Sequence, residues 1–407
     1  TPNTFIRMGS SIVKEYDGQK IAIIPDEIHE DNEFTEAAIG LAGVMVHDQE
    51  HFRLIGASAT MNPDVVMAPF ARATNRVDTS GVDVPVFQVE GRPFDVEIHE
   101  APGMTPAVAY LTKGEGHKIA ILSTRGEAQI QALRKTIVDT LGYGVSDIIF
   151  RELTGKTSAP QRAAIEQLAL NLPDDKRLVI LGSPAARSGI TIPGATFAAT
   201  DGMINREIRD QDGNWGLTTD YMSQAEVIQV LGRVGRDVAG AVGYICDPTP
   251  AETRSPKRIE ELRKLYPFKS MTDRAEYPTP AIFNANISSM SLQLAAIGQE
   301  HSLINQHTLH ELDDSAIQNA RNRLVRTFGA LDRDGKITEI GKLMDKFQVV
   351  AELSRGMAEA MLNGRSRQHM ARMALAAAAV DVGGVQRFKG AGEQGWRRFV
   401  KSGSDDD

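Results

Sequence analysis

Two carboxylates and a histidine follow the apolar residues 21–24 in the segment Asp26-Glu27-Ile28-His29. The apolar run predicts a strand, and ligands of α/β folds bind at the carboxyl ends of strands. One carboxylate in such a place can hold Mg²⁺ through oxygen or water, while its neighbour orients and deprotonates an attacking water. Because the pattern is only four residues long, a charged loop without a catalytic role is the alternative.

Hydroxyl residues follow the next predicted strand, at residues 52–55. Ser58 and Thr60 stand in the segment Gly56-Ala57-Ser58-Ala59-Thr60. Carboxyl ends of neighbouring parallel strands meet at one edge of a sheet, so we expect these hydroxyls to bond His29 and relay its state. A third segment of this kind, residues 188–193, includes Gly189 and Thr191 and follows another predicted strand.

Two arginines stand three residues apart in the segment 229–236, which follows a predicted helix. Arg233 and Arg236 are expected on one helical face. The planar fork of arginine suits transferring phosphoryl oxygens, and Gly232 and Gly235 let the backbone approach closely. A salt-bridged helix end is the alternative for this segment alone. The order of all four motifs favours a site for the γ-phosphate of a nucleotide.

The elements that must position these residues follow an α/β rhythm up to about residue 250. Short β-branched runs predict strands and alternate with helical patterns, which is typical of a parallel sheet. The predicted strands are residues 20–24, 53–55, 118–122, 178–181, 196–199 and 242–246. Residues 84–102 are rich in proline and turn-forming residues, and we interpret them as a connection between two sheet domains.

Helical periodicity dominates after Pro256. It covers residues 281–297, 315–328, 352–362 and 365–380. Within this region the Asp334-Gly335 pair predicts a hairpin over residues 330–338, placed after a helix as in the wing of a winged-helix module.

Composition bounds the class of protein. The 407 residues are 42% hydrophobic and 24% charged, which is typical of globular proteins rather than disordered or fibrous ones. The single cysteine, Cys246, excludes an internal disulfide and a cysteine-based zinc cluster, and it fits a reducing compartment. The longest apolar run, residues 373–380, is too short to span a membrane, and no leader opens the chain. We expect a cytoplasmic protein, in a bacterium or a phage-infected host, that contacts no membrane.

Charge is distributed unevenly along the chain. The formal net charge is −8, yet residues 354–401 carry nine Lys or Arg residues against three Asp or Glu. A polyanion would be steered to this basic segment, which contains Arg365, Arg367, Arg372, Arg387, Lys389, Arg397 and Arg398. A solvated helical surface is the alternative.

In this order, the motifs resemble those of the DEAH/RHA group of superfamily 2 nucleic-acid helicases. Residues 89–98 resemble the linker between the lobes of that group, and residues 328–332 with 337–342 resemble its winged-helix signature. The resemblance implies an α/β fold with two RecA-like parallel-sheet lobes, followed by a mainly α-helical winged-helix and bundle region. The implied domains are residues 1–83 (part of the first lobe), 84–104 (linker), 105–253 (second lobe), 254–347 (winged helix), 348–401 (ratchet-like bundle) and 402–407 (acidic tail).

The resemblance also implies roles for individual residues. Asp26 would coordinate Mg²⁺, Glu27 would activate water, and Ser58 and Thr60 would couple hydrolysis to strand movement. Gln229, Arg233 and Arg236 would close the nucleotide site from the second lobe. The further residues expected at the nucleotide are Gly189, Thr191, Asp201 and Gly232; those expected at nucleic acid are Thr1, Arg7, Thr124, Arg125, Trp215, Arg387 and Arg397.

The implied function is that of an NTP-dependent, RNA-directed helicase or remodeller acting 3′ to 5′. ATP or another NTP and Mg²⁺ would be the cofactors; RNA, or single-stranded DNA, would be the partner, with an activating protein partner as a further possibility. Residues 208–215 carry an Asp-Gly turn and fit the strand-separating hairpin of the group. A surface hairpin without a role is the alternative.

The largest departure from the family pattern is that no Gly-x-x-x-x-Gly-Lys-Ser/Thr loop occurs in the sequence. The segment Gly155-Lys156-Thr157 does not replace it, because Phe150 stands where the first glycine belongs and the order of motifs is wrong. We therefore expect the phosphate-binding loop to precede Thr1, and the chain alone to be inactive in hydrolysis. Arg187 and Val230 also depart from the pattern and indicate a divergent branch.

Two other classes of function are open at this point. One is a catalytically inactive, helicase-like scaffold that binds nucleic acid. The other is a zinc metallopeptidase, because His47-Asp48-Gln49-Glu50-His51 matches the His-x-x-Glu-His pattern, and helical spacing would place both histidines on one face.

Overall fold

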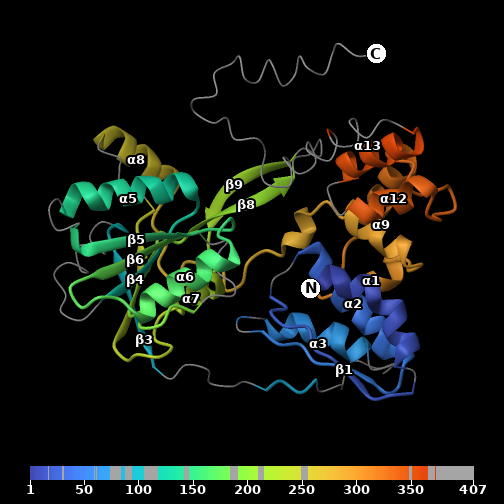
Figure 1. The fold of residues 1–407 in the computed structure, drawn as a ribbon, viewed down its shortest axis with the longest axis horizontal. Coiled ribbons are helices and arrows are strands. Elements are labelled where there is room, and N and C mark those ends of the chain that lie inside the picture. The colour runs from blue at the N-terminus through green and yellow to red at the C-terminus, as the bar shows by residue number, and fades with distance from the viewer. Residues whose placement is uncertain are drawn as a thin grey trace, which may run out of the picture. The chain divides into compact units, whose positions relative to one another are not determined.

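The computed structural model describes the chain apart from residues 17, 30–31, 59, 61, 74–83, 88–93, 105–117, 142–145, 184–190, 210–214, 249–254, 348–350, 365–371 and 373–407. The chain divides into two compact units (Figure 1). The helical unit consists of residues 1–21, 33–52 and 286–407, and the sheet unit consists of residues 22–32 and 53–285. No helix within the described ranges is long and apolar enough to cross a membrane.

A parallel six-stranded sheet forms the centre of the sheet unit. Its strands run in the order β3-β10-β7-β4-β6-β5. They are β3 (Val96–Ala101), β10 (Ala241–Cys246), β7 (Phe197–Thr200), β4 (Ile119–Ser123), β6 (Arg177–Gly182) and β5 (Ile148–Leu153). The predicted strands at residues 118–122, 178–181, 196–199 and 242–246 are confirmed, and so is the α/β class.

Helices cover both faces of this sheet. Ile119 and Ile121 face one apolar layer, whereas Ala120 and Leu122 face the other, because successive side chains of a strand point to opposite faces. Helix α5 (Glu127–Leu141) packs on the layer of Leu122. Helices α6 (Ala159–Leu170) and α7 (Gln224–Leu231) pack on the opposite layer (Figure 1). Burial on both faces explains why the inner strands β4, β6 and β7 are almost wholly apolar.

The two edge strands of the sheet are not among the strands predicted from the sequence. Strand β3 lies within residues 84–104, which we interpreted as a connection, and it pairs with β10 from Val96 opposite Ala241 to Ala101 opposite Cys246. Among the described strands, β5 pairs with β6 alone. Both strands carry charged residues on exposed positions, which hides the apolar pattern of a strand.

A two-stranded antiparallel hairpin extends from the same unit. It consists of β8 (Met203–Arg209) and β9 (Trp215–Tyr221), with Arg209 opposite Trp215. The predicted hairpin around residues 208–215 is therefore confirmed, and the tip, residues 210–214, lies outside the described residues. Helices α3 (Pro63–Arg72) and α8 (Pro256–Leu265) and the 3-10 turn η4 (Ala281–Asn284) belong to the same unit.

Two short strands, β1 (Ile21–Ile23) and β2 (Phe52–Leu54), pair with each other. They confirm the predicted strands at residues 20–24 and 53–55 and carry the motifs described below.

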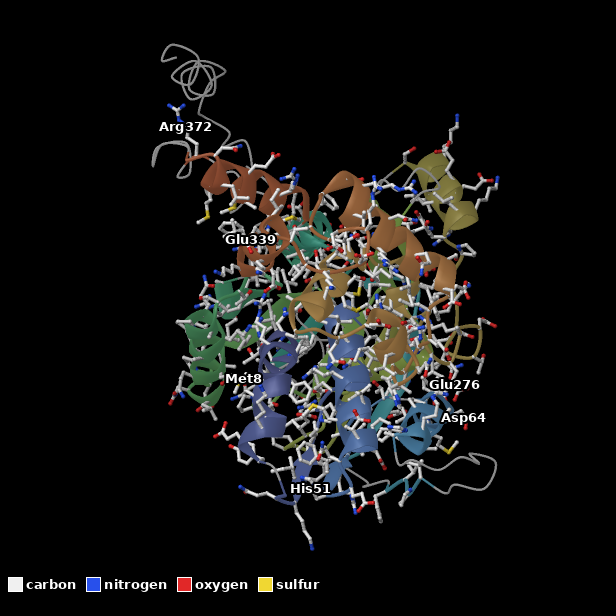
Figure 2. The ribbon with its side chains drawn as sticks, turned by 90° about the vertical axis from the view of Figure 1, so that its right-hand side faces the viewer. Met8, His51, Asp64, Glu276, Glu339 and Arg372 are labelled. Atoms are coloured by element: carbon white, nitrogen blue, oxygen red, sulfur yellow. The ribbon has the colours of Figure 1, made fainter. Side chains whose placement is uncertain are left out.

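The helical unit joins the N-terminal helices with the helices that follow residue 285. It contains α1 (Pro2–Glu15), α2 (Glu33–Asp48), α9 (Ser288–Ala296), α10 (His301–Asn305), α11 (Asp314–Asn322), the π-helical turn η5 (Arg323–Thr327), α12 (Glu339–Phe347) and α13 (Ala351–Leu362). Figure 2 labels Met8 on α1 and Glu339, which begins α12. The predicted helix at 281–297 is interrupted between η4 and α9, and the prediction at 365–380 lies outside the described residues except for Arg372.

The predicted hairpin at residues 330–338 is confirmed in a short form. Leu331 and Ile337 make one antiparallel bridge, and Asp332 N donates to Lys336 O at 2.9 Å. Gly335 has a φ of 84°, the left-handed conformation that glycine adopts without steric cost.

Helix α2 packs closely on the segment after α9. A Cβ on Gly40 would lie 2.7 Å from Ile304, and one on Gly43 would lie 2.7 Å from His307. Glu36 of α2 is only 1% exposed, and its carboxylate accepts hydrogen bonds from the backbone N–H of Leu309 and pairs with His310 Nδ1 at 2.5 Å. A buried carboxylate is tolerated here because each oxygen has a partner.

His301 at the start of α10 is a half-buried histidine of the same unit. Its Nδ1 lies 2.8 Å from Ser291 Oγ, and its Nε2 has no hydrogen-bond partner among the described residues. Burial disfavours the charged ring and lowers the pKa of His301 from 6.5 to about 4.

We expect the free energy of unfolding to decrease as the pH falls from about 6.5 towards 4, since the unfolded chain then binds a proton that the folded chain excludes. The loss should reach about 2–3 kcal/mol. His301→Asn retains a polar partner for Ser291 but does not titrate, so its stability should depend less on pH. Denaturant titrations of both proteins at about pH 7 and about pH 4.5 measure this difference, and parallel losses in the two proteins would contradict it.

Candidate functional site

The acidic segment runs beside the Ser58 segment beyond the ends of β1 and β2. Ile55 N donates to Ile23 O at 3.0 Å, and Ala57 N donates to Pro25 O at 3.0 Å. Ile28 N then donates to Ala57 O at 3.1 Å. Both segments advance in the same direction, so the parallel ladder continues into the two motifs. This pairing fixes the register between the acidic segment and the Ser58 segment.

Gly56 allows the two motifs to approach. A Cβ at this position would lie 2.7 Å from Ile28 Cδ1 and 2.9 Å from Phe70 Cζ. Ile28 is 1% exposed and anchors the acidic segment in the apolar core. The space above Gly56 is therefore filled by the side chain that holds Asp26 and Glu27 in place.

Glu27 has a left-handed backbone conformation. Its φ of 55° is the one positive value at a non-glycine residue in the described part of the chain. Asp26 Oδ1 accepts a hydrogen bond from Glu27 N at 2.9 Å, which stabilises the sharp turn. The Glu27 side chain is 45% exposed. Strained backbone of this kind is found most often at functional sites, where surrounding structure enforces it.

The ring of His29 joins three segments of the chain. Its Nδ1 lies 2.8 Å from Ser58 Oγ and 3.4 Å from Glu27 Oε2, and its Nε2 lies 2.7 Å from Gln229 Nε2. The predicted contact between His29 and Ser58 is therefore confirmed. Thr60 N also donates to Ser58 Oγ, at 3.4 Å.

The tautomer of His29 follows from the orientation of the Gln229 amide. In the assigned orientation of the Gln229 amide, its N–H donates to His29 Nε2, which must then be unprotonated. The proton of the neutral ring lies on Nδ1 and is donated to Ser58 Oγ. A flip of the Gln229 amide or a change of the ring charge would thus change the hydrogen bond between His29 and Ser58.

Helix α7 carries Gln229 near its C-terminal end. Its N-terminus has a capping box, in which Ser223 accepts from Glu226 N while the Glu226 carboxylate accepts from Ser223 N. The helix ends at Leu231 and Gly232 caps it. The prediction that Arg233 and Arg236 share one helical face is wrong, because both follow the helix in a turn that contains Gly235 at φ 72°.

Arg236 and Thr191 meet, as expected for residues of one site. Arg236 Nη1 donates to Thr191 Oγ1 at 2.9 Å, and its Nε donates to Gly232 O at 3.2 Å. Both Arg236 and Thr191 are exposed, whereas Arg233 is half-buried. Gly189 lies outside the described residues.

Asp201 and Thr124 lie together at the ends of β7 and β4. Thr124 Oγ1 donates to Asp201 Oδ2 at 2.6 Å, and Met203 N donates to Asp201 Oδ1 at 3.1 Å. Desolvation raises the pKa of the buried Asp201 carboxyl, against the lowering effect of the Thr124 hydrogen bond. Thr124 and Asp201 are thus hydrogen-bonded to each other. From the sequence, we expected Asp201 at the nucleotide and Thr124 at nucleic acid.

The residues expected at nucleic acid occupy varied places. In the helical unit, Thr1 caps α1, and Arg7 makes a bidentate ion pair with Asp345 at 2.8 and 3.0 Å. In the sheet unit, the Arg125 guanidinium lies 5.7 Å from the centre of the Tyr266 ring. Trp215 begins β9. Arg387 and Arg397 lie outside the described residues.

The zinc hypothesis loses its geometric basis. Helix α2 ends at Asp48, so His47 lies on the helix whereas His51 precedes β2. The expectation that both histidines share a helical face is therefore wrong. No group of three or more His, Cys, Asp or Glu side chains in the described ranges is arranged to hold a metal ion.

The donors of the acidic segment nevertheless fit Mg²⁺ as part of a nucleotide complex. Mg²⁺ in such sites is bound through one or two carboxylates together with substrate phosphates and water, rather than by a cage of protein ligands. Asp26 offers one carboxylate, and the hydroxyls of Ser58 and Thr60 belong to the segment whose Ala57 N–H donates to Pro25 O, the residue before Asp26.

One structural feature was not predicted from the sequence. Arg274, 5% exposed, donates hydrogen bonds to backbone carbonyls at the base of the β8–β9 hairpin. Arg274 follows Asp273 in a turn-rich segment. Its hydrogen-bond partners are backbone carbonyls, which every residue has, so no residue type in the sequence indicates the contact.

No family model matches the sequence. Similar curated proteins include the ATP-dependent RNA helicase HrpA of Borreliella burgdorferi, 23% identical over 364 residues that cover 87% of this chain and 39% of HrpA. Another is the pre-mRNA-splicing factor ATP-dependent RNA helicase prp22 of Schizosaccharomyces pombe, 24% identical over 87% of this chain and 28% of prp22. The human probable ATP-dependent RNA helicase DHX35 is 24% identical over 78% of this chain and 43% of DHX35. The chain thus spans less than half the length of each relative.

Solved structures show the same fold. The Escherichia coli DEAH/RHA helicase HrpB has a TM-score of 0.70 at 22% identity, covering 95% of this chain and 45% of HrpB. A second structure, of the E. coli DExH-box NTPase HrpB, has a TM-score of 0.65 at 21% identity, covering 98% of this chain and 46% of that chain. The six-stranded parallel sheet with helices on both faces corresponds to a RecA-like lobe.

Gly56→Ala should destabilise the protein by about 1–3 kcal/mol, because the added methyl overpacks the contact of Ile28 with Phe70. Ile28→Val removes the Cδ1 atom that the new Cβ would meet, so the double variant should lose less stability than the two single losses added together. Denaturant titrations of the four proteins of this cycle measure the coupling. Additive losses would show that Gly56 is not required by Ile28.

Proposed function

We propose that this protein acts as an NTP-dependent, RNA-directed helicase or remodeller. Its sequence relatives and its fold are those of DEAH/RHA superfamily 2 helicases. The observation that carries this proposal is the ring of His29, which contacts Glu27, Ser58 and Gln229 at once. These three residues belong to the acidic segment, the Ser58–Thr60 segment and the arginine-bearing segment. A charged loop without a catalytic role would not require this convergence.

In the proposed reaction, Glu27 orients the water that attacks the γ-phosphate of ATP and accepts its proton. Its exposed carboxylate and left-handed backbone support this role. Asp26 is the residue that would hold Mg²⁺, and the ion, when bound, supplies positive charge to the phosphate oxygens. Arg236, with Arg233 beside it, would stabilise negative charge on the γ-phosphate through its planar fork.

His29 would report the state of this site to the rest of the chain. With the Gln229 amide in its assigned orientation, the ring donates to Ser58 and accepts from Gln229, so movement of Gln229 would change the hydrogen bond that Ser58 receives. Thr60 N donates to the same Ser58 oxygen. This relay supports the role proposed for Ser58 and Thr60 in coupling hydrolysis to movement of the strand.

RNA would be the polymer on which the protein acts, in the 3′-to-5′ direction, and the β8–β9 hairpin is its proposed strand-separating element. The helical unit would carry a winged-helix module, supported by the hairpin at residues 330–338 followed by α12. Arg125 and Trp215 would contact the nucleic acid from the end of β4 and from β9. We place the protein in the cytoplasm.

Nucleic-acid binding by this chain is the first test of the proposal. Fluorescence anisotropy with labelled single-stranded RNA and DNA of one sequence, over about 50–200 mM salt, should show binding that weakens with salt and favours RNA. ATP turnover by the chain itself should be negligible, because its sequence has no Gly-x-x-x-x-Gly-Lys-Ser/Thr loop to cradle the phosphates. Binding to neither polymer would refute the proposed function, and vigorous turnover would refute our account of the nucleotide site.

Arg236→Ala should lower RNA-stimulated hydrolysis by roughly 10³-fold or more in any form of the protein that hydrolyses ATP. Arg236→Lys should rescue poorly, because a point charge lacks the planar fork. Arg151→Ala, which changes an exposed arginine of β5, is the matched control and should leave turnover unchanged. Steady-state phosphate release, with and without RNA, measures the turnover of the three variants and of the wild type. Stimulated hydrolysis within a few-fold of wild type would remove Arg236 from the nucleotide site.

A further inference from the structure

The β8–β9 hairpin is held at its base by one buried guanidinium. Arg274 Nη1 donates to Gly202 O at 2.8 Å and to Met222 O at 3.0 Å, the residues that flank the two strands. Its Nη2 donates to Lys269 O at 3.0 Å. One side chain therefore joins the start of β8, the end of β9 and the segment 266–276.

Gly202 makes room for this guanidinium. Its φ is 63°, and a Cβ at this position would approach the Arg274 guanidinium to within 2.9 Å at three atoms. Any side chain at position 202 would both strain the backbone and displace Arg274. The position of the Arg274 guanidinium thus requires a glycine at position 202.

The same segment also holds the N-terminus of α7. Gln224 N donates to Ala275 O at 2.8 Å, and Ala225 N donates to Glu276 O at 3.0 Å. Gln224 Nε2 donates to Arg274 O at 3.0 Å. N–H groups in the first turn of a helix have no partner within the helix, so residues 274–276 supply acceptors that α7 lacks.

An ion pair makes a second link between α7 and the hairpin. Arg206 of β8 donates through Nη2 to Glu226 Oε2 of α7 at 2.7 Å. The same carboxylate belongs to the capping box of α7. Glu226 is 8% exposed, so removal of Arg206 would leave a buried carboxylate without its charged partner.

Tyr221 at the end of β9 adds a third link. Its hydroxyl donates to Pro267 O at 2.7 Å, and Lys269 Nζ lies 4.2 Å from the centre of its ring. The hairpin base therefore has partners in both α7 and the segment 266–276.

We propose that Arg274 is a positioning residue that fixes the β8–β9 hairpin to the N-terminal end of α7, so that the two move as one body. Helix α7 has eight residues and a length of about 12 Å, and Gln229 lies near its other end. A displacement of Gln229, whose amide contacts His29, is therefore transmitted to the hairpin. This inference rests on the proposed function only in assigning nucleic acid to the hairpin.

The burial of Arg274 supports a structural link rather than an RNA contact. Desolvation lowers the pKa of the Arg274 guanidinium, while the nearby Asp201 carboxyl acts in the opposite direction. Its guanidinium donates to the main-chain carbonyls of Gly202, Met222 and Lys269. It also lies against the aromatic ring of Tyr221. A phosphate could reach this group only after the hairpin base had opened.

Hydrogen exchange of this chain tests the link directly. In Arg274→Gln, amides of β8 and β9 should exchange at least ~10-fold faster than in wild type, while amides of β4 and β6 stay protected. Arg263→Gln is the matched control, since it removes an exposed guanidinium on α8 that pairs with Asp247. If Arg274→Gln also exposes β4 and β6, Arg274→Lys, which keeps the charge and loses the fork, decides the question. Unchanged protection of the hairpin in a folded Arg274 variant would overturn the proposal.

Coupling is measured in a form of the protein that hydrolyses ATP. Arg274→Lys should keep RNA-stimulated kcat and the KM for ATP within about two-fold, while the number of base pairs opened per ATP falls roughly 10-fold. Equal losses in kcat and in unwinding would contradict a positioning role. If the wild-type protein neither binds RNA nor hydrolyses ATP, the proposed function fails, and the exchange comparison still decides whether Arg274 joins the hairpin to α7.

Discussion

The arrangement of the candidate site depends on the hydrogen bonds of one imidazole. His29 has one nitrogen directed to Ser58 and the other to Gln229, and these residues come from segments 171 positions apart in the sequence. An imidazole has only two ring nitrogens, so both are in use, and the ring cannot rotate without losing a bond. Glu27 stands 3.4 Å from the same ring. Glu27, Ser58 and the segment that carries Arg233 and Arg236 are thus linked through a single side chain.

Glycines create the close approaches that this linkage needs. Gly56 leaves room for Ile28 beneath the acidic segment, and Gly202 leaves room for Arg274 at the hairpin base. Gly235, at φ 72°, lies where a Cβ would come within 2.9 Å of Val96. In each case the functional geometry is determined as much by the absence of a side chain as by the groups that make hydrogen bonds.

The sequence predicted those features that depend on local pattern. The apolar runs that became β4 and β6 are buried on both faces, and the contact of His29 with Ser58 follows from adjacent strand ends. Strands β3 and β5 were not predicted, because both are edge strands and their exposed charged residues interrupt the apolar pattern of a strand. The shared helical face of the arginines was wrong because Gly232 ends α7. Arg274 could not be found, since backbone carbonyls of distant residues leave no trace in sequence spacing.

The helical unit is assembled from widely separated stretches of chain. Arg7 pairs with Asp345, and Glu36 pairs with His310, across 338 and 274 residues respectively. The sheet unit, by contrast, is complete at residue 285. Because a ribosome releases the chain from its N-terminus, the sheet unit can fold during synthesis, whereas α1 and α2 must wait for partners made much later. Helix α2, whose residues are buried on nearly all sides in the folded unit, therefore exposes its apolar residues until the chain beyond residue 285 has been made.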